Sequence, residues 1–184
     1  NAMWSILTGE FFWGIVIGLI LSFLGGWVLA LFTVQLTQKN QKQVVRNFCI
    51  DTIQNLQAII RDMDATTTRT QAIHHDFLSL IDVEISIYGR NREHLIHLPE
   101  QVRNDVRKFM NECAIKKAEI ASQLDRFYRL NSLADQIQVE GRNPEAVRTR
   151  EQAVNLLGEA RRASDRLVSV ANSASEILNR LRQL

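Results

Sequence analysis

Apolar residues fill one uninterrupted segment near the start of the chain, from Phe11 to Val34, and no charged residue falls within it. The nearest charged residues on either side are Glu10 and Lys39. About 20 apolar residues suffice to cross a bilayer core roughly 30 Å thick. A cleavable signal peptide would have a basic start and a shorter apolar stretch. The pattern therefore predicts one retained transmembrane helix over residues 11–34.

After this segment, apolar residues recur at three- and four-residue spacing, which is the period of an amphipathic helix. We expect four further helical stretches, over about 35–64, 67–89, 99–139 and 144–182. The second should be the most buried, because Val83 and Ile87 widen its apolar face. The positions expected in the core are Val45, Cys49, Leu56, Ile59, Ile60 and Met63; Ile73, Phe77, Leu80, Ile81, Ile85 and Tyr88; Val102, Val106, Phe109, Met110, Cys113, Ile120, Leu124, Phe127, Ala134 and Ile137; and Val147, Val154, Leu157, Val168, Ala171, Ala174, Ile177, Leu178 and Leu181.

Three consecutive threonines at residues 66–68 interrupt good helix-forming sequence. Their β-branched side chains lose rotamer freedom in a helix. Residues 35–89 therefore form either one long helix with a weak point or two helices with a short break, and both alternatives remain open at this stage.

Turn residues are scarce beyond the apolar segment. The chain holds only two prolines, Pro99 and Pro144, whereas strands need turn residues roughly every ten positions. The clearest turn follows the third stretch, where Gly141 suits the residue just after a helix and Asn143 suits an N-cap. We expect an all-α fold, in which a transmembrane helix precedes an elongated, coiled-coil-like antiparallel bundle of three or four helices over residues 35–184.

Small residues recur at every fourth position within the apolar segment. We call this set the small-residue ladder; it comprises Gly14, Gly18, Ser22, Gly26 and Ala30. Membrane helices associate where small side chains let two backbones approach closely. Glycine is also frequent in membrane helices generally, but five small residues in one register favour an interface. We expect the ladder to join copies of this chain in a homo-oligomer.

The first two residues, Asn1 and Ala2, precede Met3 and are typical of the remnant that a protease leaves after cleaving a purification tag. We therefore assign residues 1–10 to this remnant and a short N-terminal tail, and exclude the remnant from the fold. The transmembrane helix would then begin at Phe11.

Basic residues follow the apolar segment closely, at Lys39, Lys42 and Arg46, and none precedes it. Positive side chains next to a membrane helix favour the cytoplasmic side, where they also meet anionic headgroups. This predicts a single-pass protein of the cell inner (plasma) membrane, with its N-terminus outside and its helical bundle in the cytoplasm. The alternative is the opposite topology, with the bundle outside.

Sequence motifs of known catalytic sites are missing from the chain. It contains no GxxxxGK[ST], GxGxxG, HExxH or GxSxG pattern, which are the signatures of nucleotide-binding, zinc-protease and hydrolase sites. Cys49 and Cys113 lie far apart on apolar stripes and form no CxxC pair, so we expect buried thiols. We predict a protein that is not an enzyme and carries no cofactor.

The histidines form the one cluster with metal-binding potential. His94 and His97 would share a helical face, and with Glu93 and His74 they offer candidate ligands for a divalent metal. Spacing alone places no third ligand beside the pair. The simpler interpretation is therefore that these side chains lie in solvent or near a helix end.

Basic residues elsewhere are interleaved with acidic ones. Arg103, Arg107 and Lys108 make a local basic patch, but Glu112 and Glu119 follow on the same stretch. Binding along nucleic-acid phosphates requires a net positive field over a surface. We expect no nucleic acid among the partners.

Long apolar stripes without a catalytic constellation favour a membrane-anchored, non-enzymatic helical interaction or scaffold module. Its partners would be the lipid bilayer, further copies of itself and an unidentified protein that docks on its helices. One alternative is a sensor or signalling accessory protein. A further alternative is a metal-binding protein that uses the histidines.

Overall fold

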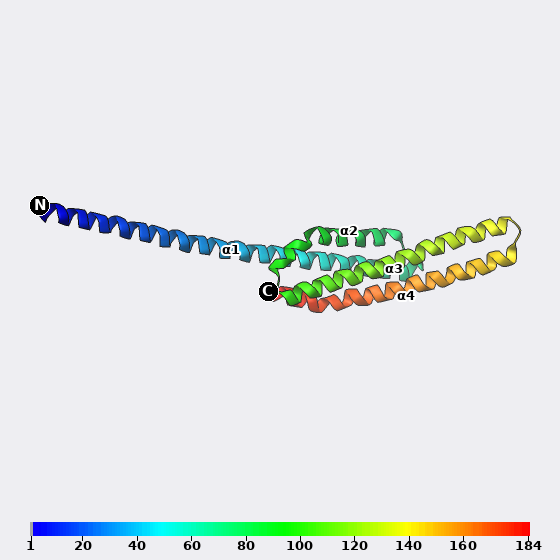
Figure 1. The fold of residues 1–184 in the computed structure, drawn as a ribbon. Helices are drawn as coiled ribbons and strands as arrows, with labels where there is room; N and C mark the ends of the chain where they lie inside the picture. Colours follow the sequence, from blue (N-terminus) through cyan, green and yellow to red (C-terminus); the bar gives the residue numbers. More distant parts are fainter. Residues whose placement is uncertain (1) are drawn as a thin grey trace. The chain divides into compact units, whose positions relative to one another are not determined.

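The computed structural model describes the backbone of residues 2–184, and the side chains of Leu24 and of residues 27–184. This part of the chain is all-α and contains no strand, which confirms the predicted class (Figure 1). Its elements are α1 (Ala2–Thr70), α2 (His75–Asn91), the 3₁₀ helix η1 (Arg92–His97), α3 (Glu100–Val139) and α4 (Asn143–Arg182).

The chain divides into two compact units, Asn1–Val44 and Val45–Leu184. Most of the predicted transmembrane segment, residues 11–34, lies outside the described side chains. Among the residues that are described, no helix is both long enough and apolar enough to cross a bilayer.

Helix α1 continues through the threonines at 66–68 and ends at Thr70. The weak point predicted there is therefore not a break, and the boundary expected between residues 64 and 67 is wrong by several residues. The Thr70 hydroxyl donates a hydrogen bond to the Thr66 carbonyl at 2.8 Å, so these side chains bond within the helix. The break instead falls at Gln71, whose φ of 57° is left-handed and ends the helix in the manner usual for a C′ residue.

One apolar core runs through unit Val45–Leu184 and joins side chains from all four α-helices. The predicted stripes of α1 and, as far as Leu124, of α3 are confirmed in this core, whereas Phe127 and Ile137 are only half-buried. Ile53, Leu56, Ile60 and Met63 are fully buried. A single buried polar contact crosses it, because the Gln57 amide donates to the Ala171 carbonyl at 2.7 Å. That hydrogen bond ties α1 to α4 across 114 residues of sequence.

Alanines, rather than valines, form the buried seam of α4 in its first half. Val147 and Val154, which we expected in the core, are 54% and 63% exposed. The buried seam follows a seven-residue repeat of Ala146, Ala153, Ala160, Leu167, Ala174 and Leu181. Helices α3 and α4 contact each other extensively, and small residues are what a close helix contact requires. The period of 3.5 residues per turn is that of a left-handed coiled coil.

The prediction that α2 would be the most buried helix is wrong. Only Leu78, Ile81 and Tyr88 of α2 are buried, while Leu80 and Val83 are 48% and 53% exposed. Helix α2 lies on one side of the bundle and buries a narrow stripe (Figure 1). The other helices of the bundle therefore cover only part of the broad apolar face of α2.

Three ion pairs hold α3 and α4 in one antiparallel register, because the two residue numbers in each pair sum to 285. They are Asp105–Arg180 at 2.8 Å, Glu119–Arg166 at 2.6 Å and Asp135–Arg150 at 2.8 Å. If α4 shifted by one heptad relative to α3, Glu119 would face Glu159 in place of Arg166. Two carboxylates in direct contact repel each other. The pairs therefore select this register over its nearest competitor.

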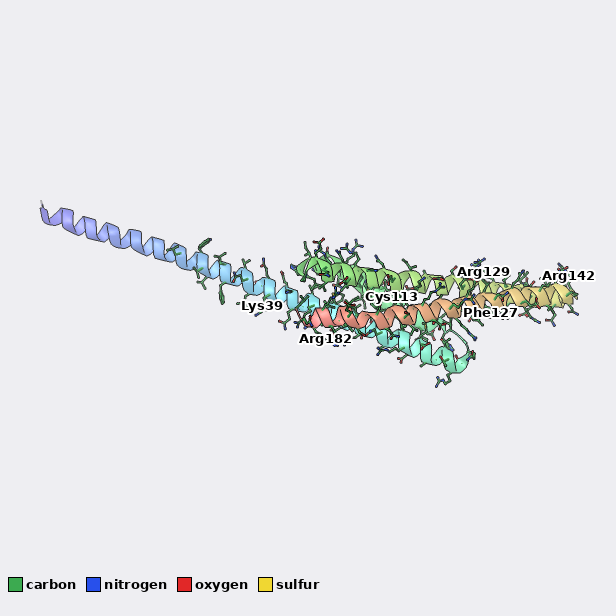
Figure 2. The ribbon with its side chains drawn as sticks, turned by 90° about the horizontal axis from the view of Figure 1, so that it is seen from below. Lys39, Cys113, Phe127, Arg129, Arg142 and Arg182 are labelled. Carbon is green, nitrogen blue, oxygen red and sulfur yellow. The ribbon has the colours of Figure 1, made fainter. Side chains whose placement is uncertain are left out.

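The turn between α3 and α4 is closed by a glycine, as the sequence predicts. Gly141 has φ 83°, and the amides of Gly141 and Arg142 donate to the carbonyls of Gln138 and Ile137, which is the Schellman pattern. The predicted N-cap is wrong by one residue, since α4 begins at Asn143 itself with Pro144 next. Figure 2 marks the two ends of α4, with Arg142 at the turn and Arg182 at the far end.

Candidate functional site

The hairpin of α3 and α4 extends past the ends of the other helices of its unit (Figure 1). At the start of α2 the ring of His75 lies near that of Tyr128, with centroids 5.7 Å apart, and Arg161 donates to the Gln71 carbonyl just after α1. We call residues 129–156, which lie beyond these contacts, the hairpin tip. The rest of unit Val45–Leu184 is the four-helix part.

The hairpin tip has a thin core that is made of alanine. Its buried side chains are Ala134, Ala146 and Ala153, so two helices lie close together with no third element over them. Of the larger apolar side chains of the tip, Leu130, Ile137 and Leu156 are half-buried, whereas four stand in solvent. They are Leu133, Val139, Val147 and Val154, with exposed fractions of 45%, 89%, 54% and 63%.

Polar contacts link the two helices of the tip along one edge. The Arg150 guanidinium donates to Asp135 Oδ1 at 2.8 Å and to Gln138 Oε1 at 2.6 Å. On α4, Val147 and Val154 line a shallow hollow together with Arg150. The valines are seven residues apart, so they occupy the same position in successive heptads. This spacing gives a narrow apolar seam with a charged edge, the kind of surface that a further helix covers in a coiled coil.

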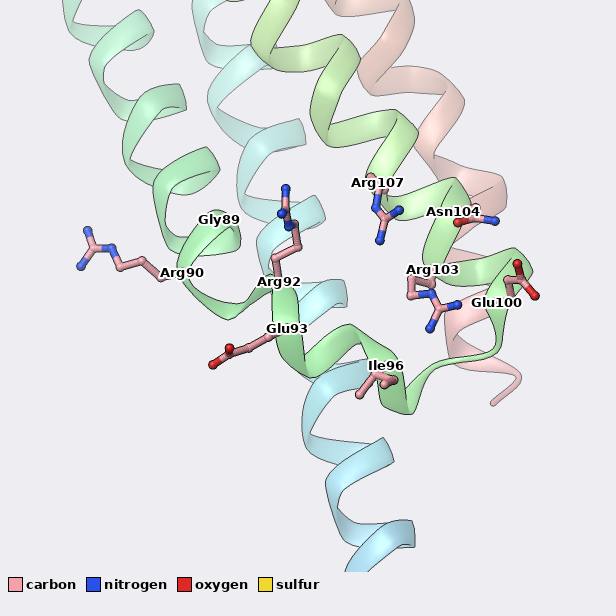
Figure 3. Close-up of a pocket in the computed structure, with 9 residues that line it drawn as sticks. All are labelled: Gly89, Arg90, Arg92, Glu93, Ile96, Glu100, Arg103, Asn104 and Arg107. Carbon is pink, nitrogen blue, oxygen red and sulfur yellow. The ribbon is translucent and has the colours of Figure 1, made fainter.

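A second candidate site lies at the opposite end of the hairpin, where α2, η1 and the start of α3 meet (Figure 3). It is an open cavity of about 620 Å³. Its charged lining residues are Arg90, Arg92, Glu93, Glu100, Arg103 and Arg107, and Gly89, Ile96 and Asn104 complete it. Four arginines and two glutamates give the lining a positive balance.

Three of these arginines extend around one space in Figure 3: Arg92 from η1, and Arg103 and Arg107 from α3. Arg90 and Glu93 point away from that space. Arg103 and Arg107 are four residues apart and so project from the same side of α3. We call Arg92, Arg103 and Arg107 the arginine cluster.

Behind the arginine cluster lies Tyr88, which is 5% exposed. Its hydroxyl makes no hydrogen bond within ordinary distance and angle limits to the described residues. Burial raises the pKa of Tyr88 and the nearby Cys49 thiol adds to that rise, whereas Arg107 and Arg92 lower the pKa in part through their positive charges, Arg107 also through a loose side-chain hydrogen bond. The hydroxyl therefore stays protonated at neutral pH and remains available as a donor.

This site cannot be recognised in the sequence because its residues come from separate elements. Arg103 and Arg107 form a local basic patch, but Arg92 lies between the stretches 67–89 and 99–139 that we predict to be helical. The signal was the shortness of the link: only Leu98 and Pro99 separate η1 from α3, so η1 must fold back against the start of α3.

The small-residue ladder falls largely outside the described residues, since the side chains of Gly14, Gly18, Ser22 and Gly26 are not described; that of Ala30 is exposed. Its role in self-association stays a prediction.

Of the membrane-proximal basic residues, Lys39 is exposed, whereas Lys42 and Arg46 are half-buried. Arg46 donates to Asn47 Oδ1 at 3.2 Å. It has no acidic partner within 4.0 Å among the described residues. The association of these three residues with headgroups stays a prediction.

The candidate metal ligands do not come together. His74 precedes α2 while His94 and His97 lie in η1 beyond its other end, and a helix of 17 residues is about 25 Å long. His94 approaches only Glu93, at 3.9 Å. Within the described part of the chain, no three histidine, cysteine or acidic side chains are placed to hold a metal ion.

Both cysteines are fully buried and unpaired by disulfide, as the apolar stripes predict. Burial raises the pKa of Cys49 to about 12. It does the same for Cys113, where Glu112 adds a smaller effect, again giving a pKa of about 12. A thiol of that pKa is protonated and unreactive at neutral pH.

Comparison of the chain with protein-family models, with curated proteins and with solved structures found no match. The site must therefore be interpreted from its own geometry.

Proposed function

We propose that this protein is a membrane-anchored, non-enzymatic helical scaffold that self-associates and presents its hairpin tip to a helical protein partner. The anchor is the apolar segment at residues 11–34, followed by Lys39, Lys42 and Arg46 at a cytoplasmic membrane surface. The small-residue ladder would join the copies.

The observation that carries this proposal is the exposed valine pair of the hairpin tip. Val147 and Val154 are more than half exposed, although alanines occupy the neighbouring buried positions. A valine seam at heptad spacing on a two-helix rod gains most when a third helix covers it, because about 25 cal/mol is gained for each Å² of apolar surface removed from water. The charged edge at Arg150 would orient that helix.

The tip can be tested with a photo-crosslinking residue placed at Val154 in the full-length chain in native membranes. A matched control carries the same residue at Arg162, an exposed position of α4 in the four-helix part. We expect crosslinks from position 154 to one defined helical segment, either in a second copy or in another protein, as read by mass spectrometry. Equal, scattered crosslinking from both positions would contradict the proposal.

The small-residue ladder can be tested separately with Gly18→Leu and Gly26→Leu in one chain. Bulk at these positions should keep the backbones apart, so the assembly mass in mild detergent should fall to that of a smaller oligomer or a monomer. The control is Leu24→Phe with Leu31→Phe, which adds bulk on the side of the helix opposite the ladder. A mass unchanged by the glycine substitutions would remove the ladder from the proposal.

A further inference from the structure

The arginine cluster is built by two neighbouring elements, η1 and α3. Helix α3 supplies Arg103 and Arg107 on one side, and the short link through Leu98 and Pro99 brings η1 back so that Arg92 faces them (Figure 3). All three side chains line the same open cavity, and Figure 3 shows Arg92 extending from η1 beside the turns of α3 that carry Arg103 and Arg107.

The positive charge of the cluster is not neutralised within the protein. No ion pair within 4.0 Å involves Arg92, Arg103 or Arg107 among the described residues. Four other arginines of the same unit do pair with acidic side chains, namely Arg142, Arg150, Arg166 and Arg180. Like charges around one space repel one another unless an anion joins them, so the cluster has the electrostatic character of an incomplete site.

The buried Tyr88 hydroxyl beside the cluster is a second observation in favour of a binding site. The Tyr88 hydroxyl is buried close to Arg107 and Arg92, and Arg107 can only donate to it, so the proton of the hydroxyl has no acceptor in the described structure. An unpaired buried polar group is costly unless something satisfies it. The cavity beside it is open and large enough, at about 620 Å³, for a small-molecule ligand.

From these observations we infer that the arginine cluster binds a phosphate group. Planar guanidinium groups donate paired hydrogen bonds that match the oxygens of phosphate. Ile96, which also lines the cavity and is 70% exposed, offers an apolar contact at the edge for whatever carries the phosphate. The carrier is either the headgroup of an anionic lipid or a soluble phosphate compound.

The cluster lies at the end of its unit where the chain enters from the predicted anchor. Tyr88 is close to Cys49, and only ten residues lie between Val34 and Val45. As part of helix α1 this stretch spans about 16 Å at a rise of about 1.5 Å per residue, so a lipid headgroup is within reach of a side chain near Val45. The lipid source rests on the proposed anchor, whereas the phosphate chemistry does not.

The test uses the full-length chain in neutral detergent at constant ionic strength, because salt screens such contacts. Three probes are titrated: sodium phosphate, sodium pyrophosphate and dihexanoyl phosphatidic acid. Binding is measured by titration calorimetry and by the rise in the midpoint of thermal unfolding, which a ligand specific to the folded state produces.

The informative variant is Arg103→Gln with Arg107→Gln. We expect roughly fivefold weaker binding for each arginine removed, and so about 25-fold for both. The matched control, Arg126→Gln with Arg129→Gln, makes the same charge change at exposed positions of the same helix and should bind within about twofold of the original chain. Should the first variant fail to fold, Arg92→Gln tests the same site from η1.

Each outcome is decisive. Phosphatidic acid that binds more tightly than inorganic phosphate identifies a lipid headgroup, and equal affinities identify a soluble phosphate compound. The inference is overturned if no probe binds the unmodified chain, or if the Arg103→Gln, Arg107→Gln chain binds as well as its control. The same titration on the Gly18→Leu, Gly26→Leu chain keeps phosphate binding separate from self-association, because the cluster lies within one copy.

Discussion

The four-helix part and the hairpin tip share two helices but are stabilised differently. In the four-helix part, large side chains such as Ile53, Leu56 and Leu167 are fully buried between helices. In the tip, the buried side chains are three alanines, and the valines point outward. The same pair of helices therefore changes from the boundary of a core to a bare two-helix rod.

The difference shows what a long hairpin requires to remain folded. Small side chains permit close backbone packing but remove little apolar area from water, and burial contributes in proportion to area. The tip thus depends on the neighbouring core, on its Gly141 turn and on contacts of Arg150. Regions with little buried area open at low free energy, so the tip should be the more dynamic region and the better suited to binding.

The largest contrast should appear on truncating one apolar side chain in each region. Leu56→Ala leaves a cavity in the four-helix part and should lower the free energy of unfolding by about 2–5 kcal/mol. Val154→Ala in the tip should change it by no more than about 0.5 kcal/mol, since that side chain is 63% exposed. Urea denaturation of both variants measures the pair of values; similar losses would show that the tip valine is covered in the free protein.

An intermediate effect should come from alkaline pH, because both thiols belong to the four-helix part. The pKa of Cys49 and of Cys113 is about 12 in the folded protein, and about 8.5 in an unfolded chain. Stability is then complete below pH about 8.5 and is lost as pH rises toward 12, because only the unfolded state releases its protons. Each thiol should contribute up to about 1.4 kcal/mol of loss per pH unit.

Urea titrations at pH 8 and pH 10 measure this slope, and a Cys49→Ala, Cys113→Ala chain is the control. The control should show a shallower decline than the unmodified protein. An identical decline in both chains would mean that the thiols are exposed or otherwise do not remain protonated. Between pH 8 and pH 10 the protection of amides from hydrogen exchange should fall less in the hairpin tip than in the four-helix part, because both thiols lie in the four-helix part.

The smallest effect is expected at the boundary between the regions. Gln71 ends α1 with φ 57°, a conformation that glycine adopts without the strain of a side chain. Gln71→Gly removes this strain and should raise the free energy of unfolding by up to about 1 kcal/mol. The greater flexibility of glycine in the unfolded chain offsets part of that gain. Gln71→Ala, which keeps a Cβ there, serves as the control and should give no such gain in thermal unfolding.

The sequence predicted the regular features of the fold because they depend on local physics. Periodicity identified the stripes of α1 and α3, and Gly141 identified the turn, since few other residues suit a left-handed position. The errors at Thr66 and Val147 have another origin. Helix α1 continues through Thr66, where the Thr70 hydroxyl bonds to the Thr66 carbonyl within the helix, despite the low helix propensity of threonine. The exposure of Val147 depends on which neighbour covers that face of α4, and apolar spacing does not contain that information.

The two candidate sites also differ in how far the sequence reveals them. The arginine cluster joins Arg92 to Arg103 and Arg107 through a fold-back of η1 that only the three-dimensional structure displays. The exposed valine seam was visible in the sequence, but we assigned it to the core because an apolar residue at helical spacing usually is buried. The alanines at adjacent heptad positions were the overlooked signal, since only small residues fit between two closely packed helices.

The hydrogen bond from Gln57 to Ala171 also has a consequence for biosynthesis. The two residues are 114 positions apart, and ribosomes add about 5–20 residues per second. The apolar stripe of α1 therefore leaves the ribosome roughly 6–23 s before its partner in α4 has been made. During that interval the apolar stripe of α1 is not yet covered by α4. Slower translation of the codons for α4 should therefore increase the binding of chaperones to the nascent chain.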